Sequence, residues 1–245
     1  MTRERQRADL FLVEHGHFES RARAQAAIRA GLVRVDGRVL SRASETIAPG
    51  AQVEAQAAHP FASRGGLKLA AALDAFGIDP AGLVCLDVGA STGGFTDVLL
   101  TRGAAHVHAV DVGRDQLHPR LRGDPRVTSF EGVDIRSLGP GRLDPAPRLA
   151  SVDVSFISLR LVLPALWPLL APGAILAALI KPQFEAGRER VGRGGIVRDG
   201  QVHAEVCAAV RGLLEERGAA ILGLIPSPIE GGDGNTEFLI GAKLP

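Results

Sequence analysis

The segment Asp87–Phe95 (Asp-Val-Gly-Ala-Ser-Thr-Gly-Gly-Phe) constrains the fold of this chain more than any other stretch. It follows a short apolar run, Leu83–Leu86, and from Phe95 on it continues with apolar residues at helical spacing. A strand, a glycine-rich turn and a helix in this order are typical of nucleotide-type cofactor sites in α/β folds. A dinucleotide fingerprint needs a middle glycine so that the backbone can approach a pyrophosphate, but this chain has Ser91 there. The pattern therefore favours S-adenosylmethionine (SAM), which has no pyrophosphate, over NAD.

An ordinary strand-to-helix turn is the alternative interpretation of this segment. Asp111 argues against it, because this acid ends the next predicted strand pattern, His106–Val112. An acid at that position is placed to accept hydrogen bonds from the ribose hydroxyls of a bound nucleoside.

The composition is that of a globular protein, with 245 residues, 46% apolar and 22% charged. This length fits one or two domains. The net charge of +1 gives no whole-chain field that would indicate a nucleic-acid partner. The two cysteines, Cys85 and Cys207, have apolar neighbours, and we expect both to be buried reduced thiols in a cytoplasmic protein. No targeting segment is visible.

An uncharged run from Leu161 to Ile180 is long enough to span a bilayer. Three prolines and Gly173 interrupt it, so we expect a helix over about 158–170, a turn and a buried strand over 174–180 instead. The sequence thus predicts no membrane association.

The N-terminal residues form a separate pattern of two short helices, over 8–18 and 21–30, and a strand–turn–strand segment over 32–40. Six arginines and a single acid lie between Arg21 and Arg42. A solvated helix face is the plain explanation of such a cluster. However, Glu19-Ser-Arg-Ala-Arg-Ala24 and Ile28–Arg38 resemble the αL RNA-binding fold of ribosomal small-subunit protein four and of pseudouridine synthases. The resemblance implies that Arg7, Arg21 and Arg23 meet RNA phosphates.

Strand and helix patterns alternate from residue 63 onward, which predicts a mostly parallel sheet covered on both faces. Ala219–Ile225 and Thr236–Ala242 are predicted to form two strands joined by a Pro/Gly loop, and a hairpin that finishes a parallel sheet is typical of SAM-dependent methyltransferases. We therefore expect an α/β fold of Rossmann-like, SAM-dependent methyltransferase type, with a small α+β RNA-binding domain before it. The predicted domains are 1–55 and 63–245, joined by a linker over 56–62.

Four charged residues stand at or near the ends of predicted elements, where a doubly wound sheet places its site. They are Lys68, Asp153, Lys181 and Glu237. Each alone is explained as an exposed residue at a strand end. Lys181 is the least ordinary, because a cation directly after seven apolar residues needs an anionic partner.

Six motifs together resemble the TlyA family of hemolysin-named rRNA methyltransferases, whose catalytic domain is FtsJ-like. They begin at Ser63 (SRGGLKL), Leu86 (LDVGASTGGFTD), Ala109 (AVDVG), Asp153 (DVSFISL), Lys181 (KPQFEAGRE) and Gly234 (GNTEFL). The resemblance implies transfer of a methyl group from SAM to the ribose 2′-hydroxyl of cytidine in ribosomal RNA, in the large subunit and with the small subunit left open. It also implies that Lys68, Asp153, Lys181 and Glu237 form a catalytic tetrad.

Within that tetrad we assign Lys181 as the base that takes the hydroxyl proton and Lys68 as the residue that positions the ribose and phosphate. Asp153 and Glu237 would hold the two lysines. The residues expected to bind the cofactor are Asp87, Gly89, Ala90, Ser91, Thr92, Gly93, Gly94, Asp111, Val112, Asp134 and Ile135. Arg64 is added to the arginines expected to bind RNA. We expect ribosomal RNA within ribosomal subunits as the partner, no metal, no membrane and a monomeric state.

Two other functions stay open at this point: a membrane-active hemolysin, and a ribosome-binding factor without catalysis. The chain also departs from the family pattern. It has no tyrosine, and where the family usually shows Val-Gly-Tyr-Gly it has Val112-Gly-Arg-Asp115, so an aromatic wall of the adenosine pocket is in doubt.

Overall fold

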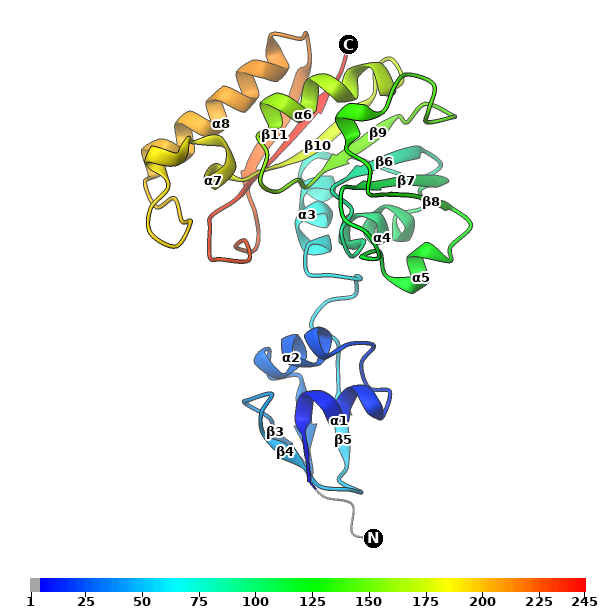
Figure 1. Cartoon of the computed structure of the whole chain (residues 1–245), viewed down its shortest axis with the longest axis vertical. Helices are drawn as coiled ribbons and strands as arrows, with labels where there is room; N and C mark the ends of the chain where they lie inside the picture. The colour runs from blue at the N-terminus through cyan, green and yellow to red at the C-terminus, as the bar shows by residue number, and fades with distance from the viewer. Residues whose placement is uncertain (1–4) are drawn as a thin grey trace. The chain divides into compact units, whose positions relative to one another are not determined.

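The computed structural model describes residues 5–245 and divides the chain into two compact units, Met1–Pro60 and Phe61–Pro245. Figure 1 labels many of their helices and strands. The smaller unit contains two helices and five short strands. These are β1 (Gln6–Arg7), α1 (Ala8–Glu14), α2 (Arg21–Arg29), β2 (Val33–Val35), β3 (Arg38–Val39), β4 (Thr46–Ile47) and β5 (Val53–Ala55).

The core of the smaller unit lies between the two helices and the strands, which pair as β1–β4 and β3–β2–β5. Ser20 caps α2 by accepting a hydrogen bond from the backbone N–H of Arg23, as a serine before a helix is expected to do. The two expected helices and the strand–turn–strand segment are therefore confirmed, while the pairing of Gln6–Arg7 with Thr46–Ile47 was not foreseen.

The larger unit is built on a seven-stranded sheet. Its strands are β6 (Val84–Val88), β7 (His106–Asp111), β8 (Val127–Glu131), β9 (Leu149–Val152), β10 (Ile175–Ile180), β11 (Ala220–Pro226) and β12 (Phe238–Lys243). They lie in the order β11-β12-β10-β9-β6-β7-β8, and only β12 is antiparallel to its neighbours. The predicted α/β fold with a terminal hairpin is confirmed.

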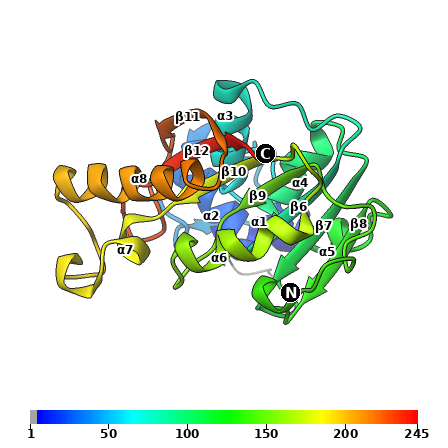
Figure 2. The ribbon, with the colours of Figure 1, turned by 90° about the horizontal axis from the view of Figure 1, so that it is seen from above.

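Helices cover both faces of this sheet (Figures 1 and 2). The helical segments are α3 (Gly66–Phe76), α4 (Gly94–Thr101), α5 (Pro119–Arg122), α6 (Leu159–Leu166), α7 (Pro182–Glu185) and α8 (Gly200–Glu215), with 3₁₀ turns at Ile135–Ser137, Trp167–Leu169 and Arg188–Arg190. One apolar core contains α6 and α8, and a second contains α3, α4 and α5. Strands buried on both faces explain the continuous apolar runs in the sequence.

The uncharged run Leu161–Ile180 forms most of α6, a 3₁₀ turn and β10, as expected from its prolines. None of the helices within residues 5–245 is both long and apolar enough to cross a membrane. Cys85 and Cys207 are buried free thiols.

One aromatic side chain of α3 packs on the antiparallel end of the sheet. Phe76 packs on Gly223 of β11 and Gly241 of β12, which are paired in register. A Cβ atom added to either glycine would lie 2.7 or 2.5 Å from the Phe76 ring, so any larger residue would have to displace that ring. The same helix carries Lys68 near its N-terminus.

Candidate active site

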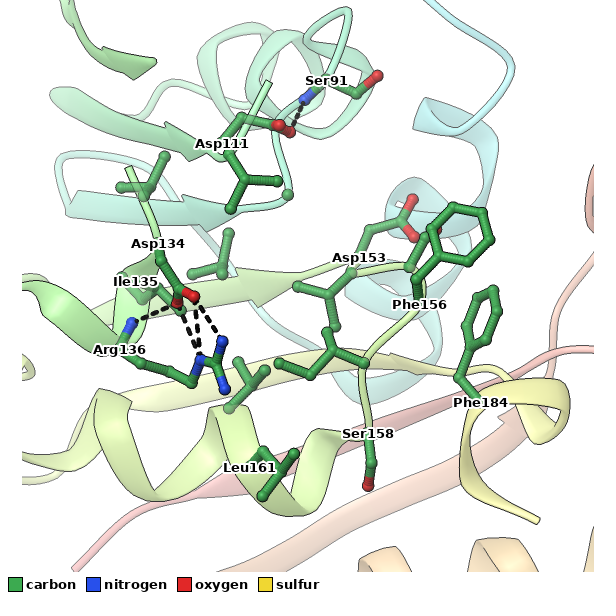
Figure 3. A pocket seen from close by; sticks show the side chains of 18 of the residues that line it. Ser91, Asp111, Asp134, Ile135, Arg136, Asp153, Phe156, Ser158, Leu161 and Phe184 are labelled. Atoms are coloured by element: carbon green, nitrogen blue, oxygen red, sulfur yellow. Dashed lines mark hydrogen bonds and ion pairs between the residues drawn. The ribbon is translucent and has the colours of Figure 1, made fainter. Parts of the chain in front are cut away.

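The glycine-rich turn after β6 lies directly against the carboxyl end of β9. Gly89 has a φ of +82°, and a Cβ added to it would lie 2.3 Å from the carbonyl oxygen of Asp153. No other residue fits this close approach. The turn continues through Ser91, also at positive φ (+45°), whose backbone N–H donates to the Asp111 carboxylate at 2.7 Å. Asp111 thereby fixes the turn that it faces (Figure 3).

A cavity of about 910 Å³ opens along the carboxyl ends of the parallel strands, between this turn and the segments that follow β9 and β10 (Figure 3). Seven of the residues expected at the site line it: Gly89, Ser91, Asp111, Val112, Asp134, Ile135 and Asp153. Its lining does not include the predicted residues Lys68, Asp87, Ala90, Thr92, Gly93, Gly94, Lys181 and Glu237, nor Arg64.

Asp87 is placed behind the cavity rather than in it. Its side chain is fully buried and accepts hydrogen bonds from Thr96 Oγ1 at 2.7 Å and Ser151 Oγ at 2.9 Å. Burial raises the pKa of this carboxyl to about 6, against the hydrogen bonds from the two hydroxyls, which lower it. Asp87 therefore ties β6 to α4 and β9 behind the turn.

Asp134 and Arg136 form the far wall of the cavity. The carboxylate of Asp134 accepts from the Arg136 guanidinium at 2.6 Å and from its backbone N–H at 2.9 Å (Figure 3). The hydrogen bond from the Arg136 side chain holds the pKa of Asp134 below its ordinary value. Next to them, Val112, Val133 and Ile135 provide an aliphatic wall.

The four residues of the expected tetrad form two ion pairs at the carboxyl end of the parallel strands. Lys68 pairs with Glu237, and both side chains are buried. The Lys181 ammonium lies 2.6 Å from Asp153 Oδ1 and donates to Ser155 Oγ at 2.8 Å.

The register of the strands explains this meeting. Ile180 is paired with Phe238 and Ala178 with Val152, so Lys181, Glu237 and Asp153 each lie just beyond the same end of three adjacent strands. Lys68 reaches Glu237 from α3, which packs against β12. Lys181 is therefore in contact with Asp153, which lines the cavity. The Lys68–Glu237 pair lies between α3 and the start of β12 and is buried.

An aromatic pair at the cavity was missed by sequence reasoning. Phe156 is 91% exposed, has a φ of +63°, and its ring lies 5.1 Å from that of Phe184 (Figure 3). Glu185 joins the two segments, because its carboxylate accepts from Ser158 Oγ at 2.5 Å and from the backbone N–H of Leu159 at 2.7 Å. The signal in the sequence was a phenylalanine among polar residues just after a strand end, in Asp153–Ser158.

Arg7, Arg21 and Arg23, which are expected to bind RNA, already have partners within the smaller unit. Arg7 and Arg21 pair with the buried Asp9 at 3.1 and 2.8 Å, which leaves about half of each side chain exposed. Arg23 is mostly buried and donates to Glu19 and to the carbonyl of His59. Arg64, in the larger unit, is exposed.

The site fits a SAM-like cofactor on two observations: the close backbone approach at Gly89, and the acid at the end of β7 held toward the turn by Ser91 and Gly113. Within residues 5–245 there is no cluster of three or more metal-ligating side chains.

Comparison with known proteins agrees with this fold. Residues 61–244 match the FtsJ-like methyltransferase family and residues 6–53 match the S4 domain. The chain is 45% identical to the "Putative rRNA methyltransferase YqxC" of Bacillus subtilis, covering 100% of this chain and 88% of that protein. It is equally 45% identical to the 16S/23S rRNA (cytidine-2'-O)-methyltransferase TlyA of Mycobacterium tuberculosis, covering 96% and 89%.

Among solved structures, a "Putative hemolysin" from Streptococcus thermophilus superimposes with a TM-score of 0.77 at 43% identity, covering 98% of this chain and 88% of that one. The N-methyltransferase NodS from Bradyrhizobium japonicum, solved with S-adenosyl-L-homocysteine, has a TM-score of 0.52 at 15% identity and covers 73% and 88%. This second likeness concerns the fold alone.

Proposed function

This chain belongs to the TlyA family of FtsJ-like methyltransferases, and from this premise we propose that it transfers a methyl group from SAM to the ribose 2′-hydroxyl of a cytidine in ribosomal RNA. The observation that carries the proposal is the Lys181–Asp153 pair, which lies where the glycine-rich turn meets the end of β9. A base at this junction is next to the expected position of the cofactor.

SAM, when bound, supplies a methyl group activated by its attachment to a sulfonium sulfur. We assign its binding to the turn at Gly89–Ser91, with Asp111 accepting from the ribose and Asp134 near the adenine amine. The backbone approach allowed by Gly89 and the hydrogen bond from Ser91 to Asp111 support this assignment. Asp87, Thr92, Gly93 and Gly94 act by shaping the turn, since they do not line the cavity.

The residues of the chain then act on the hydroxyl. A ribose oxygen becomes a good nucleophile as it loses its proton, and the Lys181 amine is the group that takes it. Only a neutral amine can accept this proton. The Asp153 carboxylate contacts the Lys181 amine and either orients it or receives a proton from it. Ser155 fixes the same amine from the other side. We assign Lys68 and Glu237 to holding the adjacent strand end and the RNA backbone in place.

The remaining surfaces suit an RNA substrate. Phe156 offers an exposed ring on which an unstacked base can lie, as bases do on aromatic side chains in RNA-binding sites. In the S4-type unit, the side chains of Arg7 and Arg21 are about half exposed, and arginine side chains are suited to binding phosphates.

Methyl transfer from radiolabelled SAM to purified ribosomal subunits, followed by mass mapping of ribose methylation, tests the proposal. We expect label in a 2′-O-methylcytidine of ribosomal RNA. Binding of subunits without any transfer would instead indicate a ribosome-binding factor, and would overturn the proposal.

A further inference from the structure

Gln183 lines the cavity from the segment that follows β10, two residues after Lys181. The Oε1 atom of its side chain is buried and has no hydrogen-bond partner within residues 5–245. A buried amide oxygen without a donor destabilises a fold, so such an atom calls for a functional explanation.

The other buried side-chain atoms without a hydrogen-bond partner either lie away from the cavity or contact a charged group. His108 and Trp167 do not line the cavity, and Asp153 Oδ1 is in ion-pair contact with Lys181. In the part of the chain that the structure describes, Gln183 thus supplies the unpartnered acceptor of the cavity wall.

The position of Gln183 in the sheet separates it from the cofactor residues. The turn, Asp111 and Asp134 follow β6, β7 and β8, whereas Gln183 follows β10, on the other side of β9. Its chain neighbour Phe184 packs against the exposed Phe156. A base stacked on this aromatic pair would therefore lie beside the segment that carries the Gln183 amide.

Cytosine presents an amine donor at N4 beside an acceptor at N3, and a glutamine amide presents an acceptor beside a donor. Glutamine reads the equivalent donor–acceptor pair of adenine in the same bidentate way. The terminal amide torsion of glutamine is broad, so a rotation about Cγ–Cδ is enough to turn Oε1 toward the cavity.

We propose that Gln183 reads the edge of the target cytosine, its Oε1 accepting from the N4 amine and its Nε2 donating to N3. This inference rests on the proposed function and adds the residue that recognises the base. It concerns the contact with the N4 amine and not the choice between cytosine and uracil, because uracil presents the reverse pattern, which a rotated amide also satisfies.

The test is a double-mutant cycle between one side chain and one group of the base. Once the methylated cytidine is mapped, ribosomal subunits are reconstituted with RNA that carries either cytosine or 2-pyrimidinone, which lacks only the N4 amine, at that position. For wild-type protein we expect kcat/KM to fall about 10-fold or more on removal of the amine. For Gln183→Met, which keeps the volume of the side chain, we expect the two RNAs to differ by less than about 3-fold.

Two further variants control the result. Gln183→Glu keeps an acceptor and should still favour cytosine. Gln116→Met changes the other glutamine of the cavity lining, which lies on the cofactor side, and should keep the full discrimination. SAM affinity, measured by calorimetry, should be unchanged in both Gln183 variants, which also shows that they are folded.

Equal losses on removal of the amine in wild type and Gln183→Met would overturn the role of Gln183 while leaving the methyltransferase intact. A wild-type protein that methylates no cytidine would overturn the proposed function itself, and this inference with it.

Discussion

Lys68 and Glu237 are separated by 169 residues in the chain and form a buried ion pair that joins α3 to the start of β12. Two charges held away from water are tolerated only while each satisfies the other. The pair therefore has a structural role as well as the catalytic one that we propose, and the two roles can be separated.

Glu237→Gln leaves the Lys68 ammonium buried without an anion, and we expect the free energy of unfolding to fall by about 3 kcal/mol or more. Lys68→Met combined with Glu237→Gln removes the unpaired charge and should recover most of that loss. Methyl transfer should stay low in both variants if the pair serves the reaction. Urea unfolding followed by fluorescence of Trp167, the single tryptophan, measures the stability. Recovery of activity along with stability would restrict the pair to a structural role.

Lys181→Ala removes the proposed base, and we expect methyl transfer to fall by about 10²–10⁴-fold. SAM affinity should stay within a few-fold of wild type, since Lys181 does not line the cavity. Lys181→Arg is the informative control, because a guanidinium keeps the charge beside Asp153 but never deprotonates in proteins. Single-turnover rates with ribosomal subunits distinguish the roles. An arginine variant with near-normal rates would show that a cation, and not a base, is needed.

Asp87 should make the larger unit less stable as the pH rises from about 4 to about 6. Burial raises its folded pKa to about 6 from an ordinary value of 3.8, so the fold favours the protonated carboxyl. Its contribution is complete below the unfolded pKa and is lost as the pH passes through the folded one. A shift of about two units corresponds to about 3 kcal/mol at most. The difference between wild type and Asp87→Asn in urea unfolding isolates this effect, and a difference that does not vary over this range would contradict it.

Asp9 should act with the opposite sign in the smaller unit. The hydrogen bond from Arg7 is the main cause that holds its pKa well below the ordinary value, with Arg21 and Gln25 adding to it. The carboxylate thus stabilises the unit above the unfolded pKa, near 4, and this contribution is lost as the pH falls below it. Hydrogen exchange of the α1 and α2 amides should show a loss of protection on acidification in wild type. In Asp9→Asn protection should be weaker at neutral pH and less dependent on pH.

Much of the fold could be predicted because its signals are local. Continuous apolar runs bounded by glycine and proline indicate buried parallel strands, and they locate β6, β7 and β10 to within about one residue. The tetrad was named from motifs, and the fact that its members lie at strand ends was visible in the sequence. Its division into Lys68–Glu237 and Lys181–Asp153 was not, because the pairing depends on the strand order and register, which no local pattern encodes.

Other features depend on contacts between distant segments in the same way. The sequence position of Asp87, in the glycine motif, is typical of a ligand-binding acid. Its hydrogen bonds from Thr96 and Ser151, which hold the side chain inside the fold, depend on the positions of α4 and β9. In the sequence, Asp9 is an ordinary acid of a helix. Its ion pairs with Arg7 and Arg21 form only because β1 and α2 lie beside it in the fold. Phe156 is exposed and has a positive φ, a conformation that sequence rarely predicts for a bulky residue.

Phe76 and Lys68 lie on the same short helix, about two turns apart, and the glycine strip on β11 and β12 sets how closely that helix can approach. We expect a methyl group at either glycine to push the Phe76 ring and, with it, α3. The Lys68 amine at the other end of the helix would then move away from the Glu237 carboxylate. Loss-of-function variants recovered by random mutagenesis should thus include Gly223 and Gly241, which do not line the cavity.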